Sequence, residues 1–336
     1  VLAETTAGCG GPSGRGSDPT PPRGGGTRME LVCPAGTPAA LRSAVEAGAH
    51  TIYCGFADET NARNFPGLNF TREELAEGVE FAHRSGAKVL VAINTFPRAG
   101  ALDVWHRAVN DAERAGADAV ILADLGLLAF AAEKNSGLRR HLSVQAAAAN
   151  PDAINMSAEA FGVKRVVLPR VLSVQEIADI NREIEIETEV FVFGGLCVMA
   201  EGRCSLSSYA TGLSPNMNGV CSPASHVEYA KDREERVARV GGFTIHRTPK
   251  GKPVPYPTLC KGNFVSREQT GHIFEDPASL DATELIPALA KAGVRALKIE
   301  GRQRSRAYVG EVVRVFRTAV AAASRGAAPR ARYITS

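Results

Sequence analysis

Short apolar runs alternate with helical patterns along most of the chain. The runs are rich in β-branched residues and do not alternate apolar with polar positions, which is typical of strands buried on both faces. Eight strands separated mostly by helices predict a (β/α)8 TIM-barrel-like fold. A doubly wound open sheet is the second choice, and an incomplete or distorted barrel would give the same pattern. The eight runs start near Glu30, Thr51, Lys88, Ala119, His141, Arg165, Glu189 and Ala296.

Helix ends and starts carry their own signals. Glycine closes a helix in the left-handed conformation, so a glycine between a helical pattern and an apolar run marks a helix end. Such glycines are Gly48, Gly86, Gly116, Gly137, Gly162 and Gly293. Capping-box spacing marks helix starts at Thr71 with Glu74, Ser173 with Glu176, and Asp281 with Glu284.

The alternation breaks between the seventh and eighth runs, from Gly194 to Pro277. Glycines, prolines and turn pairs in this stretch predict an irregular insertion, with one helix from His226 to Val240. We therefore expect a barrel over residues 29–325 that contains the insertion 194–277, a disordered leader over 1–28 and a tail over 326–336. The leader has almost no large apolar residue with which to offset its ordering entropy.

Composition narrows the class of protein. A hydrophobic fraction of 44% and a charged fraction of 22% suit a soluble protein with a full core. The net charge of +3 gives no global field for nucleic acid or anionic membranes. The most apolar stretch, Ala119 to Ala132, is interrupted by Asp124 and is shorter than the ~20 residues of a membrane span. Without the apolar region of a secretory signal, we expect a cytoplasmic protein.

Seven cysteines in a reducing compartment argue against a disulfide framework. Four of them, Cys197, Cys204, Cys221 and Cys260, lie in the insertion with gaps of six, sixteen and thirty-eight residues. No pair has the C-x-x-C spacing of a zinc ribbon. Four thiolates can hold a [4Fe-4S] cluster, but spacing alone leaves structural zinc and unliganded core cysteines equally open.

Polar residues follow the predicted strands. In a barrel of this type the chemistry lies at the carboxyl ends of the strands. Strand ends also meet water and are polar for that reason alone, and arginines there can form structural ion pairs with Asp124, Glu201 or Glu300. The candidates for the site are Asn61, Arg63, Asn94, Asp124, Gln145, Arg170, Glu300 and Arg302.

The run from Glu189 to Cys197, continued by residues 202–207, resembles the signature of the collagenase-like peptidase family. Gly195 stands where that signature usually has Ser or Ala. The resemblance extends from Met29 to about Ala321, and within the family it is strongest to members that act in ubiquinone biosynthesis. The further shared phrases are Met29–Gly36, Thr60–Arg63, Gly67–Thr71, Ala92–Phe96, Val167–Ser173, Tyr256–Gly262 and Lys298–Ser305.

This resemblance implies a cofactor, an activity and partners. It implies that Cys197, Cys204, Cys221 and Cys260 ligate a [4Fe-4S] cluster. It also implies a heterodimer with a UbiV-like protein that carries its own cluster and hydroxylates the aromatic ring of ubiquinone precursors without O2. Prephenate is the implied oxygen donor of related members that hydroxylate RNA bases. A sterol-carrier-like accessory protein is the implied source of the lipid substrate.

The polar strand ends gain roles from this activity. Arg63, Arg170 and Arg302 suit a dicarboxylate donor, because arginine forms bidentate pairs with carboxylates. Asn61 and Gln145 are expected to complete the substrate site. We expect the catalytic group, which orients donor and ring, to be drawn from Asn94, Asp124 and Glu300.

The sequence bears on three other functions. A peptidase is disfavoured because the chain has neither an H-E-x-x-H nor a G-x-S-x-G motif, and thiolates bound to iron cannot attack a peptide. Prephenate-dependent hydroxylation of RNA bases is the leading alternative, with the arginine-rich stretch 302–317 as a phosphate contact. A noncatalytic assembly subunit would have the same ligands.

Overall fold

The computed structural model describes residues 29–135, 137–197, 199, 204–218, 221–254, 256–266, 269–274, 276 and 278–329. The predicted leader, most of the predicted tail and Glu201 lie outside these residues. Within the described ranges, no helix combines the length and the apolar character needed to cross a lipid bilayer.

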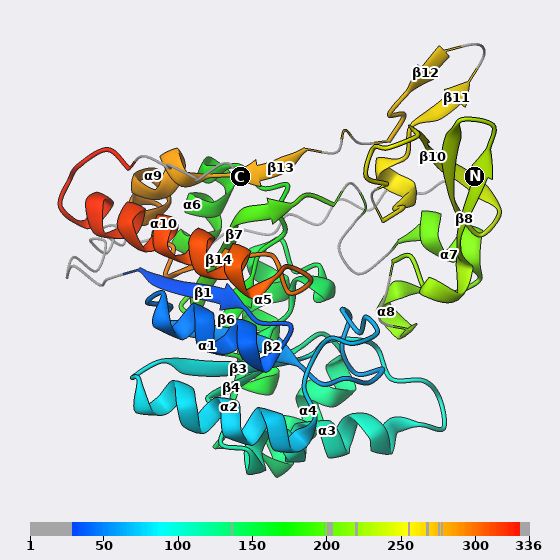
Figure 1. Cartoon of the computed structure of the whole chain (residues 1–336). Coiled ribbons are helices and arrows are strands. Elements are labelled where there is room, and N and C mark those ends of the chain that lie inside the picture. Colours follow the sequence, from blue (N-terminus) through cyan, green and yellow to red (C-terminus); the bar gives the residue numbers. More distant parts are fainter. Residues whose placement is uncertain are drawn as a thin grey trace, which may run out of the picture.

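Eight parallel strands close into a barrel, which confirms the predicted fold (Figure 1). Neighbours along the chain pair in parallel from β1 to β7, β7 pairs with β14, and β14 returns to β1. Closure of the sheet rules out the open doubly wound alternative. Each strand begins within two residues of its predicted start. The strands are β1 (Glu30–Pro34), β2 (Thr51–Gly55), β3 (Lys88–Ile93), β4 (Ala119–Leu122), β5 (Arg139–Leu142), β6 (Arg165–Val167), β7 (Glu187–Gly195) and β14 (Ala296–Ile299).

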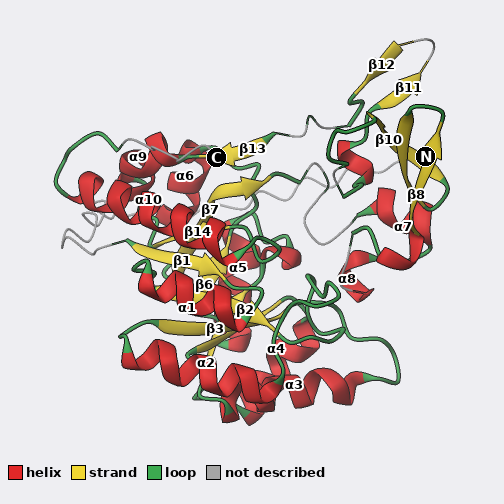
Figure 2. Cartoon of the chain, viewed as in Figure 1, coloured by secondary structure: helices red, strands yellow, loops and turns green. Residues whose placement is uncertain are grey.

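Helices surround the strands on the outside (Figure 2). Two predicted capping boxes are present, at Thr71 with Glu74 and at Ser173 with Glu176. The third is not, because the Asp281 side chain instead accepts the N–H of Thr283 at 3.0 Å, ahead of a 3-10 turn. The helices are α1 (Pro38–Glu46), α2 (Arg72–Arg84), α3 (Leu102–Arg114), α4 (Leu125–Lys134), α5 (Pro151–Phe161), α6 (Val174–Glu183), α9 (Ile286–Lys291) and α10 (Arg306–Ser324), with 3-10 turns η1 (Val144–Ala146) and η4 (Thr283–Leu285).

The barrel has two apolar layers, one between its strands and the surrounding helices and one inside it. The main core lies between strands and helices and includes Trp105 and Phe316, which are fully buried. Inside the barrel the apolar set is smaller, with Tyr53 and Ile121 among its members. The buried charged side chains of Glu189 and Lys298 lie on the strands β7 and β14. The interior is therefore partly polar.

The insertion between β7 and β14 lies on the side of the barrel where the strands end (Figure 1). It has a small apolar core centred on Val240, Ile245 and Leu259. Its last strand pairs antiparallel with the end of β7, which attaches the insertion to the barrel. Its elements are α7 (Ser205–Thr211), α8 (Pro215–Asn218), η2 (Ala224–His226), β8 (Val227–Asp232), β9 (Glu235–Val240), β10 (Phe243–Pro249), η3 (Leu259–Lys261), β11 (Phe264–Ser266), β12 (Gln269–Gly271) and β13 (Ser279–Asp281).

The helix predicted from His226 to Val240 is wrong, because this stretch forms the hairpin of β8 and β9. The lysine, arginine and glutamate residues there favour a helix, but propensity is a weak prior that packing overrides. Val237 and Val240 are fully buried on β9, and Arg233 turns the chain with a φ of +55°. Burial of valines in a small antiparallel sheet decides the structure here.

Candidate active site at the barrel mouth

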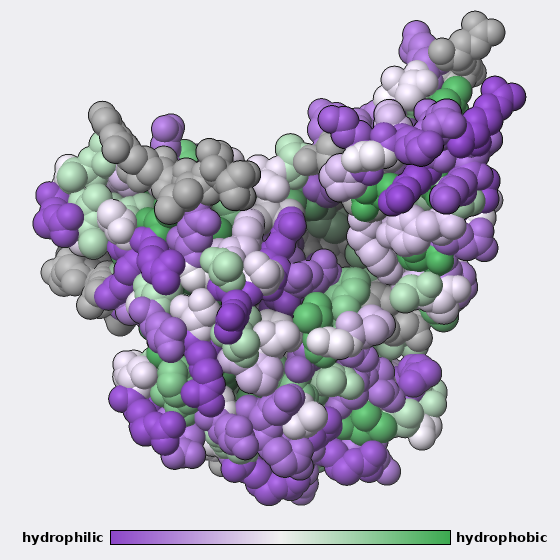
Figure 3. All heavy atoms as spheres, viewed as in Figure 1, coloured by the Kyte–Doolittle hydropathy of each residue, from purple (hydrophilic) through white to green (hydrophobic). Residues whose placement is uncertain are grey.

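A cavity that is partly open to solvent lies at the carboxyl ends of the barrel strands. In Figure 3 the surface is hollowed between the barrel and the insertion at the upper right. The structure brings six of the eight predicted site residues together in the cavity lining. These six are Arg63, Asn94, Gln145, Arg170, Glu300 and Arg302.

Asn61 and Asp124 do not line the cavity. Asn61 is fully buried behind it, where its side-chain oxygen accepts from Arg302 Nη1 at 2.8 Å and its amide donates to Asn69 Oδ1 at 2.9 Å. Asn61 therefore holds Arg302 in place from behind. Asp124 is the N-cap of α4 and accepts the N–H of Leu127 at 2.9 Å. That contact is a helix cap, which accounts for an aspartate at this strand end.

Amides and hydroxyls form one wall of the cavity. Asn94 accepts the N–H of Ala62 at 3.1 Å and its amide lies 3.4 Å from Ser143 Oγ. Gln145 follows Ser143 on the turn η1, and its side-chain oxygen is buried without a hydrogen-bond partner in the described structure. A buried acceptor of this kind usually has a partner, so it points to a donor on a ligand.

The inner end of the cavity, which we call the floor, is formed by Tyr53, Phe191 and Lys298. The Lys298 ammonium lies 3.8 Å from the centre of the Tyr53 ring, and Arg170 lies 3.6 Å from that of Phe191. Sequence analysis missed these three residues because they lie inside apolar strand segments. One signal was available, since Lys298 interrupts the otherwise apolar segment Ala296–Ile299.

Charge in the cavity is mostly positive. Arg63, Arg170, Lys298 and Arg302 line it, against one carboxylate, that of Glu300. Burial lowers the pKa of Arg302, although the guanidinium is still a cation at neutral pH. Glu300 accepts the N–H of Gly195 at 3.2 Å, which links the cavity to the start of the insertion. The arrangement suits a ligand with more than one negative group.

The four insertion cysteines have partly buried side chains. Burial raises the pKa of Cys204, and the thiols of Cys221 and Cys197 raise it further, so these three lie close enough to interact. Cys260 is on η3, which packs against α7 directly after Cys204. Tyr256 Oη donates to the carbonyl of Ser222 at 2.6 Å and so ties the segment before Cys260 to the segment of Cys221.

This donor set fits a [4Fe-4S] cluster in number and in kind, because such clusters take four thiolates. Further hydrogen bonds hold the segments together: the Ser207 N–H lies 3.4 Å from Cys204 Sγ, and Ser207 Oγ donates to the carbonyl of Cys221 at 2.6 Å. Over the described residues, no three His, Cys, Asp or Glu side chains are already arranged as metal ligands. Cluster binding would therefore draw the four thiols closer together.

The chain is similar in sequence to one protein family and to several of the known proteins with which it was compared. The model of peptidase family U32 matches residues 36–334. tRNA hydroxylation protein P of Escherichia coli is 32% identical, covering 89% of this chain and 69% of that protein. tRNA hydroxylation protein P1 of Bacillus subtilis is 33% identical, covering 87% and 63%. The 23S rRNA 5-hydroxycytidine C2501 synthase of Escherichia coli is 31% identical, covering 86% and 39%. The chain thus spans 39–69% of the length of these relatives.

Proposed function

Because the chain belongs to peptidase family U32 and has relatives named for RNA hydroxylation, we propose that it is an iron-sulfur subunit of an O2-independent hydroxylase. One observation carries the proposal: a cationic cavity at the barrel mouth lies beside an insertion that contains four cysteines. Among the described residues that line the cavity there is neither a cysteine nor a histidine, so the Cys–His and Ser–His pairs of many peptidases are missing from it.

We assign a separate role to each group of residues in and beside the cavity. Arg63, Arg170 and Arg302 would hold the carboxylates of a dicarboxylate oxygen donor such as prephenate. Gln145 would accept a hydrogen bond from this oxygen donor. Asn94 and Glu300 would orient the oxygen donor and the aromatic ring of the substrate. Cys197, Cys204, Cys221 and Cys260 would hold the cluster, which supplies redox chemistry when bound.

For the substrate we propose the aromatic ring of a ubiquinone precursor, with the chain acting as a UbiU-type subunit beside a UbiV-like partner. The shared phrases Thr60–Arg63 and Lys298–Ser305 support this, since both include cavity residues. The floor also supports it, because the rings of Tyr53 and Phe191 give the cavity apolar surface for an aromatic substrate, beside the cations Lys298 and Arg170 that lie over them. A sterol-carrier-like protein would deliver the prenylated substrate.

Hydroxylation of RNA bases is the second candidate. It is supported by the names of the relatives, several of which are tRNA hydroxylation proteins at 30–33% identity. RNA that copurifies with the protein, together with unchanged quinone levels in anaerobic deletion cells, would favour it. Quinone loss in those cells without bound RNA would favour the ubiquinone precursor.

The cofactor is tested by purification without oxygen, followed by absorption spectra and by iron and sulfide assays. We expect a brown protein with about four irons per chain. Cys221→Ser should lose the iron and, in a mixture with the UbiV-like partner, the hydroxylation of a prenylated phenol. Cys54→Ser is the matched control and should keep both, because Cys54 is buried on β2. A colourless, iron-free wild-type protein would contradict the proposal.

A further inference from the structure

Lys298 is an unusual residue for the interior of a barrel. It lies on β14 with a side chain only 5% exposed, yet it lines the cavity floor. An amine that deep must be matched by a counter-charge or be neutral. Its Nζ atom lies 2.5 Å from Glu189 Oε1, and the Glu189 side chain is completely buried.

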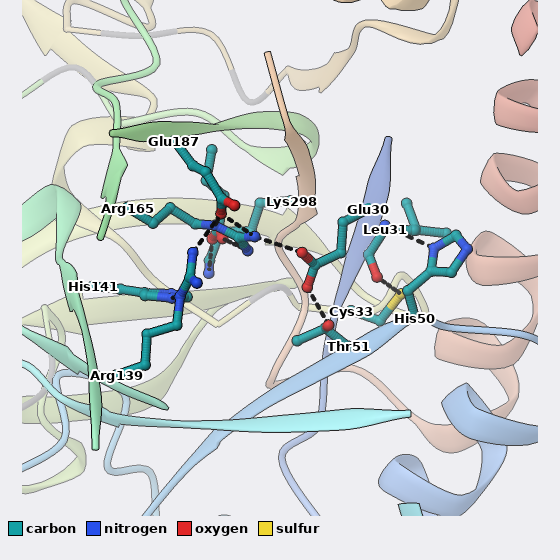
Figure 4. A network of polar contacts seen from close by, with 11 residues as sticks. Glu30, Leu31, Cys33, His50, Thr51, Arg139, His141, Arg165, Glu187 and Lys298 are labelled. Carbon is teal, nitrogen blue, oxygen red and sulfur yellow. Dashed lines mark hydrogen bonds and ion pairs between the residues drawn. The ribbon is translucent and has the colours of Figure 1, made fainter. Parts of the chain in front are cut away.

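A second layer of charges holds Glu189 from below. Arg165 on β6 donates to Glu189 Oε2 at 3.2 Å and also pairs with Glu187 at 2.7 Å. In Figure 4 the Arg165 guanidinium reaches between Glu187 and Glu30. Each end of Glu189 is thus occupied, one oxygen by Lys298 and the other by Arg165. The carboxylate has no freedom to turn away from the lysine.

We propose that Lys298 is a fourth cationic contact for an oxyanion ligand of the cavity, and that Glu189 is the positioning residue that keeps this ammonium fixed and charged. The inference rests on the proposed function only for the identity of the ligand. The anion would lie between Lys298 at the floor and the arginines nearer the mouth, with Gln145 and Asn94 at the side.

A purely structural ion pair explains the arrangement less well. Replacing a buried pair with apolar residues is often neutral or stabilising, so burial alone gives little reason for the pair. Lys298 also lines the cavity, where its ammonium lies 3.8 Å from the centre of the Tyr53 ring and 5.9 Å from that of Phe191. The counter-ion of Lys298, Glu189, is by contrast not among the described residues that line the cavity.

The proposal predicts that the affinity of the cavity for anions depends on pH. Burial lowers the pKa of Lys298 below 10.5, Glu189 opposes this, and Arg302 and Arg165 add to the lowering. The other groups near the lysine are Tyr53 on β2, His141 on β5 and Cys33 on β1. Anion affinity should therefore fall as pH rises through the Lys298 pKa. Loss of the Glu189 charge should move that fall to lower pH.

Calorimetric titration of the full-length protein with prephenate and with sulfate tests the inference. Lys298→Met should weaken binding about tenfold or more, and Lys298→Arg should restore it and remove the pH dependence. Glu189→Gln should bind nearly normally at low pH and lose affinity at a lower pH than wild type. Lys291→Met, at an exposed lysine of α9, is the matched control. Circular dichroism and thermal melting confirm that each variant is folded.

The outcomes distinguish the role of Lys298 from the identity of the oxygen donor. Binding of sulfate but not of prephenate, weakened by Lys298→Met, would support the inference and contradict prephenate as donor. Prephenate binding that a folded Lys298→Met leaves unchanged would overturn the inference and leave the donor in place. Failure of wild type to bind either anion would overturn both. A Glu189→Gln variant with the wild-type pH profile would overturn the role of Glu189.

Discussion

Gly194 and Gly195 end strand β7 beside Glu300, but only one of them has room for a side chain. Gly194 has a φ of +115°, and a Cβ there would lie 2.6 Å from Glu300 Cβ. A Cβ on Gly195 would meet nothing closer than Glu300 Oε2 at 3.7 Å, an ordinary contact. The collagenase-like signature, which usually has Ser or Ala at the second position, agrees with this difference.

We therefore expect the same substitution to destabilise the protein strongly at Gly194 and only slightly at Gly195. Gly194→Ala should cost about 2 kcal/mol or more of unfolding free energy and displace Glu300, because both the backbone and the contact are strained. Gly195→Ala should cost less than about 0.5 kcal/mol. Urea unfolding and hydroxylation assays of both variants measure this, and equal effects would contradict it.

Asn61 acts through Arg302 rather than on a ligand. Asn61→Ala would remove the acceptor of the buried Arg302 guanidinium and should destabilise the protein by about 1–3 kcal/mol. It should also weaken prephenate binding. Asn61→Asp keeps an acceptor for Arg302 and should bind prephenate better than the alanine variant. Titration of both variants provides the measurement, and equal affinities would show that Arg302 does not depend on this contact.

Among the elements, the sequence predicts the repeated strands and helix ends of the barrel but misses features that depend on tertiary packing. The eight strands and five of the six helix-ending glycines were identifiable because each signal is local, and these five glycines have positive φ. The β8–β9 hairpin was not, since Val240 is buried partly by residues of other segments, such as Leu206 and Leu259. Lys298 and Tyr53 were missed for a similar reason, because barrel closure decides which side of a strand faces the cavity.

The insertion is the element with the weakest core of its own. Its apolar core contains few residues, of which Val240, Ile245 and Leu259 are buried. A small core of this kind usually needs a metal or other cross-link. We expect removal of iron by a chelator to expose the insertion to proteolysis within residues 204–274 while the barrel stays intact. Mass spectrometry of the fragments reports the cut sites. Equal resistance with and without iron would mean that the insertion folds unaided.

One charge network links the barrel strands β1, β5, β6, β7 and β14, and it predicts how the stability of the protein depends on pH. Burial holds the pKa of His141 far below 6.5, and Arg165, Arg139 and Lys298 add to this. The folded protein therefore binds fewer protons than the unfolded chain below pH 6.5, so stability is lost as pH falls there, by up to about 1.4 kcal/mol per pH unit. Burial raises the pKa of Glu30, but Arg165 and Thr51 outweigh it, and the resulting lower pKa removes further stability only at pH values below about 4.5.

Substitution of His141 should therefore change only the upper part of the acid response. His141→Gln keeps a neutral acceptor for Arg139, which lies 3.0 Å from the ring, and should flatten the loss of stability between about pH 6.5 and 5. The fall below about pH 4.5 should remain, because Glu30 is unchanged. Urea unfolding followed through Trp105 reports on the barrel alone, since this single tryptophan is buried on α3. His106→Gln, at a partly exposed histidine of the same helix, is the control. An unaltered slope in His141→Gln would place the acid sensitivity in other groups of the network.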